Sequence, residues 1–334
     1  MQGAALYSDL DDRLYGVAGT WQLRRCQECG LVWLDPRPDA ADLGRLYETY
    51  YTHEDDARMS FVQRSVRRGI PAAIFDYRDA AGWAERVAGR LLAAIGPLRE
   101  AARRSVMALS AGSRGHLLDV GCGGGLFLSV MHDLGWQVSG TETDGRAAAT
   151  ARRRVPTATI HEGLLEELGL AESTYDAITL SHVIEHVPDP ESMLRCCARL
   201  LRPGGQMVLV TPNAASLGVA RFGRAWRGWE VPRHIHVFDR ETLVRVAERA
   251  GIEVCSAESV ASSAFYLYLE GLRLERSTPG GPPAAGTPVS RLDRVRAVAF
   301  WLRQYAAVRL GRPVGEEVLL VARRASAAGS SASG

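Results

Sequence analysis

Two hydrophobic periodicities alternate along the middle of the chain, between about Arg114 and Ser259. Short apolar runs such as 117–120 and 206–212 are typical of buried strands, whereas 126–134 repeats its apolar residues at helical spacing. This alternation predicts a mostly parallel sheet with helices on both faces. Ligands of such sheets bind at the carboxyl ends of the strands, so the residues that follow each apolar run are the first candidates for a site.

Changes in composition divide the rest of the chain. A strand-and-turn segment comes first, followed by a helical segment in which Trp83, Val87, Leu91, Leu92 and Ile95 fall at helical spacing. We expect that helix to pack over the ligand site. The predicted units are 1–58, an N-terminal segment; 59–110, a helical cover; 111–261, the α/β core; 262–314, a helical and loop insertion; 315–324, the final strand of the sheet; and 325–334, a disordered tail.

The predicted insertion contains a second helix rich in apolar residues. Residues 278–288 are rich in Pro and Gly and predict a loop, and 292–310 combine Val295, Val298 and Leu302 with several arginines. The pattern predicts a lid, or a helix that pairs with a second copy in a homodimer. A basic amphipathic helix can also make peripheral contact with a membrane surface.

Charge and cysteine content narrow the class of protein. The formal net charge of the 334-residue chain is only +2, which argues against nucleic acid as a partner. No window approaches the roughly 18 consecutive apolar residues of a membrane span, and the N-terminus lacks the pattern of a secretion signal. Six cysteines at irregular positions do not form a disulfide framework. We therefore expect a cytoplasmic protein.

The apolar run at 117–120 contains an acid and leads directly into a turn dense in glycine, LLDVGCGGG at 117–125. Glycine lets the backbone turn sharply and approach a ligand, and the helix that follows offers free N–H donors. The dinucleotide pattern G-x-G-x-x-G is incomplete, because Leu126 stands at its third glycine, and no Gly-Lys-Ser/Thr follows for a phosphate loop. Asp119 suits a cationic ligand better than a pyrophosphate. Glu142 ends the next strand at the distance where a carboxylate reaches ribose hydroxyls.

Four motifs in order resemble the class I S-adenosylmethionine (SAM)-dependent methyltransferases. They are LLDVGCGGG at 117–125, VSGTE at 138–142, YDAITLSHVIEHVPDP at 175–190 and LRPGGQMVLVTPN at 201–213. The resemblance implies a Rossmann-like fold with a mostly parallel seven-stranded sheet, a small N-terminal segment and a helical insertion before the last strand. It also implies SAM as cofactor, bound by Asp119, Gly121, Cys122, Gly123, Gly125, Glu142, Thr143, Leu164, Leu165, Ser181 and His182. Leu164 stands where the family often has an acid for the adenine, so we expect backbone atoms of Leu164 and Leu165 to serve there.

A cysteine pair near the N-terminus resembles half of a zinc knuckle. Cys26 and Cys29 are followed by Gly30, and together present two thiolates to one metal, but a structural zinc needs four ligands. His53 is a candidate third ligand. A bacterial subgroup of the methyltransferases has two such pairs ahead of its methylation domain. We therefore expect either a missing N-terminal stretch or a degenerate knuckle.

The segment 182–186 fits H-x-x-E-H, a pattern also found in zinc proteases. That chemistry needs both histidines on one long helix, whereas Pro188 and Pro190 follow at once. We therefore interpret the segment as the end of a strand entering a loop. Quinone-biosynthesis O-methyltransferases have similar Glu-His pairs, and some use a divalent metal, so Glu185 and His186 are metal candidates. The alternative is that both residues form hydrogen bonds that shape the acceptor side.

The acceptor site is predicted in the loop 224–238, which follows the fifth strand of the core. Aromatic rings stack on sugars and aromatic compounds, and Arg and His bind polar groups, although a structural loop anchored by tryptophans is the alternative. A hydroxyl or activated carbon acceptor needs a base, for which we expect His234 first and His186 second. The remaining acceptor candidates are Trp226, Trp229, Glu230, Arg233, His236 and Phe238.

These motifs predict a methyltransferase that acts on a polar small molecule or a glycan or sugar intermediate, with O- or C-methylation favoured over N-methylation. A quinone-precursor O-methyltransferase is the first alternative. An NAD-binding oxidoreductase and a non-catalytic binding protein on the same fold are alternatives of other classes.

Overall fold

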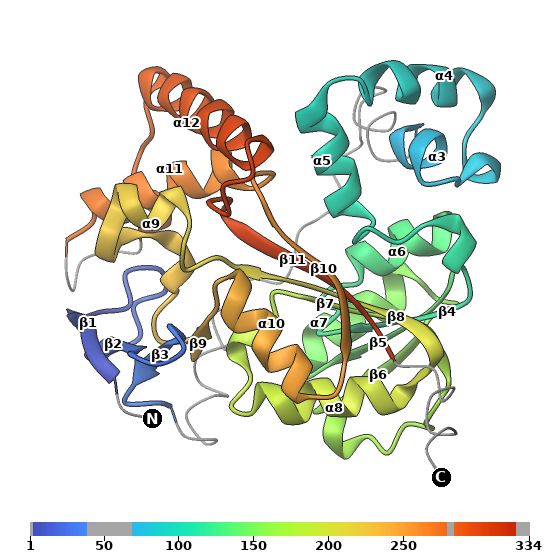
Figure 1. The fold of residues 1–334 in the computed structure, drawn as a ribbon, viewed down its shortest axis with the longest axis horizontal. Coiled ribbons are helices and arrows are strands. Elements are labelled where there is room, and N and C mark those ends of the chain that lie inside the picture. Colours follow the sequence, from blue (N-terminus) through green and yellow to red (C-terminus); the bar gives the residue numbers. More distant parts are fainter. Residues whose placement is uncertain (1–2, 39–68, 279–283, 325–334) are drawn as a thin grey trace, which may run out of the picture.

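In the computed structural model, which describes residues 3–38, 69–278 and 284–324, a seven-stranded sheet forms the centre of the molecule (Figure 1). Its spatial order is β10-β11-β8-β7-β4-β5-β6, and every pairing is parallel except the two that β11 makes. The predicted mostly parallel sheet is therefore confirmed. The strands are β4 (His116–Val120), β5 (Gln137–Glu142), β6 (Thr159–Glu162), β7 (Tyr175–Ser181), β8 (Leu201–Pro212), β10 (Glu253–Val260) and β11 (Glu317–Arg323).

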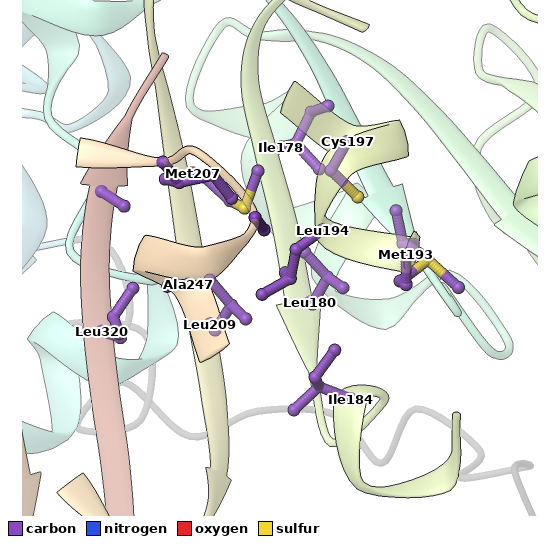
Figure 2. Packing of buried hydrophobic residues seen from close by; sticks show 14 of the residues in the cluster. Ile178, Leu180, Ile184, Met193, Leu194, Cys197, Met207, Leu209, Ala247 and Leu320 are labelled. Atoms are coloured by element: carbon purple, nitrogen blue, oxygen red, sulfur yellow. The ribbon is translucent and has the colours of Figure 1, made fainter. Parts of the chain in front are cut away.

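Helices cover both faces of this sheet because its strands are apolar on both sides. On one face, α8 (Pro190–Leu200) and α10 (Arg240–Arg249) pack on side chains of β7, β8 and β11, as Figure 2 shows around Leu194 and Leu209. On the other face, α6 (Leu126–Asp133) and α7 (Gly145–Arg154) pack on β4 and β5. These two packed clusters hold the strands in place, so that the strand ends that carry the motifs lie along one edge of the sheet.

Three helices precede the core: α3 (Ile70–Ile74), α4 (Trp83–Leu92) and α5 (Gly96–Ser105). Tyr77 attaches this region to the sheet, because its hydroxyl donates to Leu109 O at 3.2 Å and accepts from Trp136 Nε1 at 3.0 Å. Burial raises the pKa of Tyr77 to about 12, against the opposing effects of Trp136 and Arg114. The helical prediction is confirmed for the described residues, but the predicted packing of α4 is wrong, since the side chains of Trp83 and Leu91 are 75% and 71% exposed.

The N-terminal segment forms a second, antiparallel sheet from β1 (Gly3–Leu10), β2 (Trp21–Cys26) and β3 (Val32–Asp35). Its fourth strand is β9 (His236–Val237), which comes from the loop that the sequence assigned to the acceptor. Pairing of Trp33 with His236 therefore joins the first segment of the chain to the acceptor loop. Figure 1 shows this sheet beside the core.

The insertion before the last strand contains α11 (Ala264–Arg276), the short turn η8 (Ala284–Gly286) and α12 (Arg291–Arg309). The carboxylate of Glu316, at the start of β11, accepts from Gln304 Nε2 at 2.6 Å, Trp226 Nε1 at 2.7 Å and Gly218 N at 2.9 Å. One buried acid thus ties α12, the acceptor loop and α9 (Leu217–Phe222) to the edge of the sheet.

None of the helices within residues 3–38, 69–278 and 284–324 is both long and apolar enough to cross a membrane. The predicted disordered tail at 325–334 lies outside the described residues.

Candidate active site

The glycine bend between β4 and α6 has the backbone that its sequence predicts. Gly121, Gly123 and Gly125 have φ values of +68°, +54° and +76°, a region that other residues rarely adopt. Space is also short, because a Cβ atom at Gly121 would lie 2.7 Å from the side chain of Val183 and one at Gly125 would lie 2.9 Å from Ala151 Cα. Only glycine lets the bend lie this close to its neighbours.

Glu142 holds the bend in place from the neighbouring strand. Its Oε2 accepts from Gly123 N at 2.8 Å, and its Oε1 accepts from Thr143 N and Asp144 N at 2.8 and 2.9 Å. A carboxylate that accepts several backbone N–H groups is fixed in direction. The predicted pair of glycine bend and acid is thus one connected unit at the carboxyl edge of the sheet.

Asp119 is the buried acid beneath the bend, with 4% of its surface exposed. Its Oδ1 accepts from Thr179 Oγ1 at 2.7 Å. Burial raises the pKa of Asp119 to about 7, with a further contribution from the negative charge of Glu142, against the opposing effects of Thr179 and Arg104. A positively charged ligand stabilises the ionised form of a buried carboxyl group whose pKa is raised in this way.

Arg104 is a residue of this site that the sequence analysis missed. It lies at the end of α5, and its Nη2 donates to Ser181 Oγ at 3.1 Å while its Nε lies 3.6 Å from Glu317 Oε2. The cover helix therefore brings a cation to the ends of β7 and β11. Nothing in the sequence distinguishes Arg104 among the arginines of the chain.

His182 follows β7 with a left-handed backbone, φ +56°. Its ring lies between two carboxylates, with Nδ1 3.2 Å from Glu185 Oε1 and Nε2 2.8 Å from Glu317 Oε1. Burial opposes a charge on this ring, but the two carboxylates outweigh it and raise the pKa of His182 to about 9. The chain then enters the short turn η5 (Ile184–His186) rather than a long helix. This confirms the predicted end of a strand entering a loop and removes the zinc-protease interpretation.

Glu185, His186 and His234 form a second cluster, in which one potential ligand atom of each residue lies within 4.8 Å of the others. Each ring uses Nδ1 for a backbone carbonyl: His234 contacts Gly228 O at 2.8 Å and His186 contacts Arg233 O at 3.1 Å. If Nδ1 carries the proton in both rings, each Nε2 keeps its lone pair.

The charges of this cluster also suit a cation. Burial, reinforced by His186, lowers the pKa of His234 to about 4, so this ring is neutral near pH 7. Burial alone would raise the pKa of Glu185, but the hydrogen bond from His182 and the neighbouring histidines bring it to about 2. A carboxylate and two imidazoles whose other nitrogens contact carbonyls are a common set of metal ligands. The residues therefore fit a divalent cation.

The predicted acceptor residues are all buried, His234 included, and several have partners inside the protein. Trp226 Nε1 donates to Glu316, Trp229 Nε1 donates to Gly223 O at 2.9 Å, and His236 Nδ1 contacts Val187 O at 3.1 Å. Arg233 forms two hydrogen bonds of 3.0 Å with the carboxylate of Asp12. Each of the four side chains thus has a polar atom that is bonded within the protein, and its role toward the acceptor stays a prediction. We therefore leave them out of the proposed mechanism.

The two remaining sets of candidates are also located. Cys26 is buried and Cys29 is partly buried at the turn between β2 and β3, and no third ligand joins them among the residues that the structure describes. His53 lies outside those residues. Beyond β6, Leu164 is exposed, whereas the side chain of Leu165 lies in the core.

Comparison with known proteins shows the family to which this chain belongs. A family model described as "Methyltransferase domain" matches residues 95–257. A ubiquinone biosynthesis O-methyltransferase of Thiobacillus denitrificans is 32% identical over 175 residues, which cover 48% of this chain and 73% of that protein. The chain belongs to the class I SAM-dependent methyltransferases. SAM is the cofactor of this family, and the predicted fold and cofactor are therefore confirmed.

Other similarities are partial. The ubiquinone biosynthesis O-methyltransferase of Xanthomonas oryzae pv. oryzae is 35% identical over 147 residues, and the chain spans 60% of that protein's length. A crystal structure of a SAM-dependent methyltransferase from Archaeoglobus fulgidus is 19% identical, with a TM-score of 0.45, over 68% of this chain and 93% of that one.

Proposed function

We propose that this methyltransferase transfers the methyl group of SAM to a hydroxyl oxygen of a small-molecule acceptor. The observation that carries the proposal is the buried Asp119 beside a glycine bend held by Glu142. That pair of acids suits a ribose together with a positively charged ligand, which describes SAM. The name of the O-methyltransferase relatives supports oxygen as the acceptor atom.

The cofactor would lie along the carboxyl ends of β4, β5 and β7. Glu142 would accept from the ribose hydroxyls, the backbone of 121–125 would face the methionine part, and the exposed Leu164 would cover the adenine. Arg104 adds a cation that can bind a carboxylate of the cofactor or of the acceptor. The other predicted contacts are Cys122, Thr143, Leu165, Ser181 and His182.

Methyl transfer then needs alignment and the removal of one proton. SAM brings its own leaving group, so holding the hydroxyl oxygen in line with the S–CH₃ bond supplies much of the acceleration. His234 is neutral near pH 7, and its Nε2 lies 4.0 Å from Glu185 Oε1, which would stabilise the imidazolium after proton uptake. His186 lies beside it, with ring centroids 4.7 Å apart, and is the second candidate for the base.

Glu185, His186 and His234 are also where a divalent cation would bind. Such an ion would lower the pKa of an acceptor hydroxyl bound to it. It would thereby promote loss of the same proton that a base would remove. A histidine whose Nε2 binds a metal cannot also take a proton there, so the two roles are alternatives. Removal of metal by a chelator separates them, because a histidine base keeps its activity after dialysis and a metal-dependent enzyme loses it until a divalent cation is restored.

The relatives favour a phenolic acceptor, since their name places them in quinone biosynthesis. A sugar hydroxyl is the second candidate, favoured by the resemblance of the Cys26–Cys29 pair to the knuckle-bearing subgroup. A panel of catechols and hexose derivatives, assayed with methyl-labelled SAM, tests both. We expect label in at least one catechol and its loss in His234→Gln. Saturable SAM binding without label in any member of the panel would contradict the proposed acceptor class.

A further inference from the structure

Two helices carry apolar side chains on the side that faces solvent. On α4 these are Trp83, Val87 and Leu91, which recur at every fourth residue, and on α12 they include Val295 and Leu302, exposed by 64% and 50%. Spacings of three and four residues bring such side chains to one helix face. Single exposed apolar residues are ordinary, but a continuous exposed apolar face marks an interaction site.

The buried side of α12 is apolar as well. Ala297 is fully buried, and Phe300 contacts Tyr268 of α11 with ring centroids 4.9 Å apart. A helix that is apolar on opposite faces is normally covered on both. The outward apolar side chains of this helix and its C-cap are Leu292, Val295, Val298, Leu302 and Leu310.

The exposed faces of α4 and α12 lie on the same side of the molecule, with the start of α5 between the two helices. Ile95 is 51% exposed and continues the apolar face of α4 to the start of α5. There α12 meets the same junction, because a Cβ atom added at Gly96 would lie only 1.8 Å from the Tyr305 hydroxyl. Figure 1 shows both helices at the top of the molecule, on the side away from α8 and α10.

This surface stands over the edge of the sheet that carries the cofactor motifs. The helix α5, which continues from α4, reaches that edge through the contact of Arg104 with Ser181, and α12 reaches it through Gln304 and Glu316. A partner bound to the surface would therefore lie near the carboxyl end of β7 and the start of β11.

Charge decides what kind of partner fits. The only acid of α12, Asp293, pairs with Arg276 of α11, whereas its arginines form no ion pair with any other described residue. A second copy of this chain would bring like charges together, whereas an anionic lipid surface would satisfy them, with the long aliphatic stems lying on the apolar face. These arginines are Arg291, Arg294, Arg296, Arg303 and Arg309.

We propose that the exposed faces of α4 and α12 bind the surface of an anionic lipid membrane. The arginines lie among the headgroups, and Trp83, Leu91 and Leu302 enter the boundary with the acyl chains. The proposal goes beyond methyl transfer and stands without it, because it depends only on these two helices.

Cosedimentation of the full chain with vesicles tests the proposal. We expect at least about tenfold stronger binding to phosphatidylcholine vesicles that contain phosphatidylglycerol than to phosphatidylcholine alone. Two double variants, Val295→Ser with Leu302→Ser and Arg296→Glu with Arg303→Glu, should each weaken binding by about tenfold or more. Arg240→Glu, an exposed arginine on α10, is the matched charge control and should bind as the wild type does.

Unchanged SAM affinity and unfolding midpoint show that the variants are folded. Vesicle binding that survives both double variants would overturn the proposal, as would equal binding to neutral and anionic vesicles. Light scattering adds a further contrary result: a dimer that dissociates in Val295→Ser with Leu302→Ser, in a chain that binds no vesicles, would assign the surface to a second copy.

Discussion

The proposed cofactor half and the proposed acceptor half of this protein are built in different ways. At the cofactor edge, Asp119, the glycine bend and Glu142 come from one stretch of 24 residues, and each acid lies in a strand of the core. The acceptor side depends on contacts across the chain, such as Arg233 with Asp12, which are 221 residues apart. Local sequence therefore describes the first half well, whereas the second half exists only when the N-terminal sheet has folded onto the loop.

Replacement of His234 should have the largest effect, and only in the acceptor half. His234→Gln should lower kcat by about 10²–10⁴-fold, since it removes the proposed base, and should leave SAM affinity unchanged. Because burial lowers the pKa of His234 to about 4, the wild-type rate should be insensitive to this group at neutral pH and fall only in acid. Single-turnover kinetics measures the rate and its pH dependence, and a SAM titration measures the affinity. His161→Gln, on β6, is the control. A normal kcat would exclude His234 from the mechanism.

Breaking the ion pair of Asp12 and Arg233 should loosen the acceptor half. Both side chains are fully buried, and Asp12→Ala removes two of the three hydrogen bonds that carboxylates accept from Arg233, with only Glu230 left as its partner. The variant should therefore cost about 3–5 kcal/mol of unfolding free energy. Denaturant unfolding measures this cost, and Asp11→Ala, in the more exposed pair with Arg13, is the matched control. Equal stability of the two variants would show that the N-terminal segment does not hold the acceptor loop.

Removal of Glu142 should affect the other half alone. Glu142→Ala frees Gly123 N and removes the proposed partner of the ribose, so SAM affinity should fall by about 100-fold, the equivalent of two charged hydrogen bonds. Calorimetry measures the loss. Glu162→Gln, at the exposed end of the next strand, should retain wild-type affinity. Similar losses in both variants would show that the position in the sheet, not the carboxylate of Glu142, is responsible.

We expect the ionised carboxylate of Asp119 to lower the stability of the fold and to strengthen cofactor binding. Its folded pKa of about 7 lies above the ordinary value of 3.8, so its ionisation destabilises the fold, beginning above pH 4 and reaching its full extent above pH 7. Asp119→Asn should therefore raise the unfolding free energy at pH 8 by about 1–3 kcal/mol and change it little at pH 4.

The same substitution should weaken SAM binding and remove its pH dependence. In the wild type, affinity for this cation should fall by up to about tenfold for each unit below pH 7, as Asp119 takes up a proton. Thermal unfolding and titrations between pH 5 and about pH 8 measure both effects. An asparagine variant that is less stable than the wild type at pH 8 would contradict the assigned state of Asp119.

The sequence predicted the core strands, the order of the motifs along them and the acids that they carry. These features depend on local periodicity and on the positions of glycine. The sequence did not predict Arg104 or Asp12, whose roles come from tertiary contacts with residues far along the chain. Nor could it show that Trp226 and Trp229 are buried and form hydrogen bonds within the protein. The sequence of a loop does not show whether an aromatic residue faces a ligand or, like Trp226, donates to a buried acid such as Glu316.

Periodicity also predicted the helices at Trp83 and Val295. It predicted that the first packs over the ligand site, and for the second it left a lid, a dimer contact and a membrane contact open. Helical spacing shows that apolar side chains share a face, and only the position of the neighbouring helices shows whether that face is covered. In α4 and α12 it is exposed. This exposure corrects the packing predicted for α4, and it is the observation from which we propose the membrane surface.

Titration of the intact chain with SAM, its demethylated product and NAD decides whether the glycine bend and its two acids bind SAM. We expect saturable, one-to-one binding of SAM and of the product, weakened by Glu142→Ala, and no heat with NAD beyond dilution. Binding of NAD together with failure of both adenosyl compounds to bind the folded protein would contradict it.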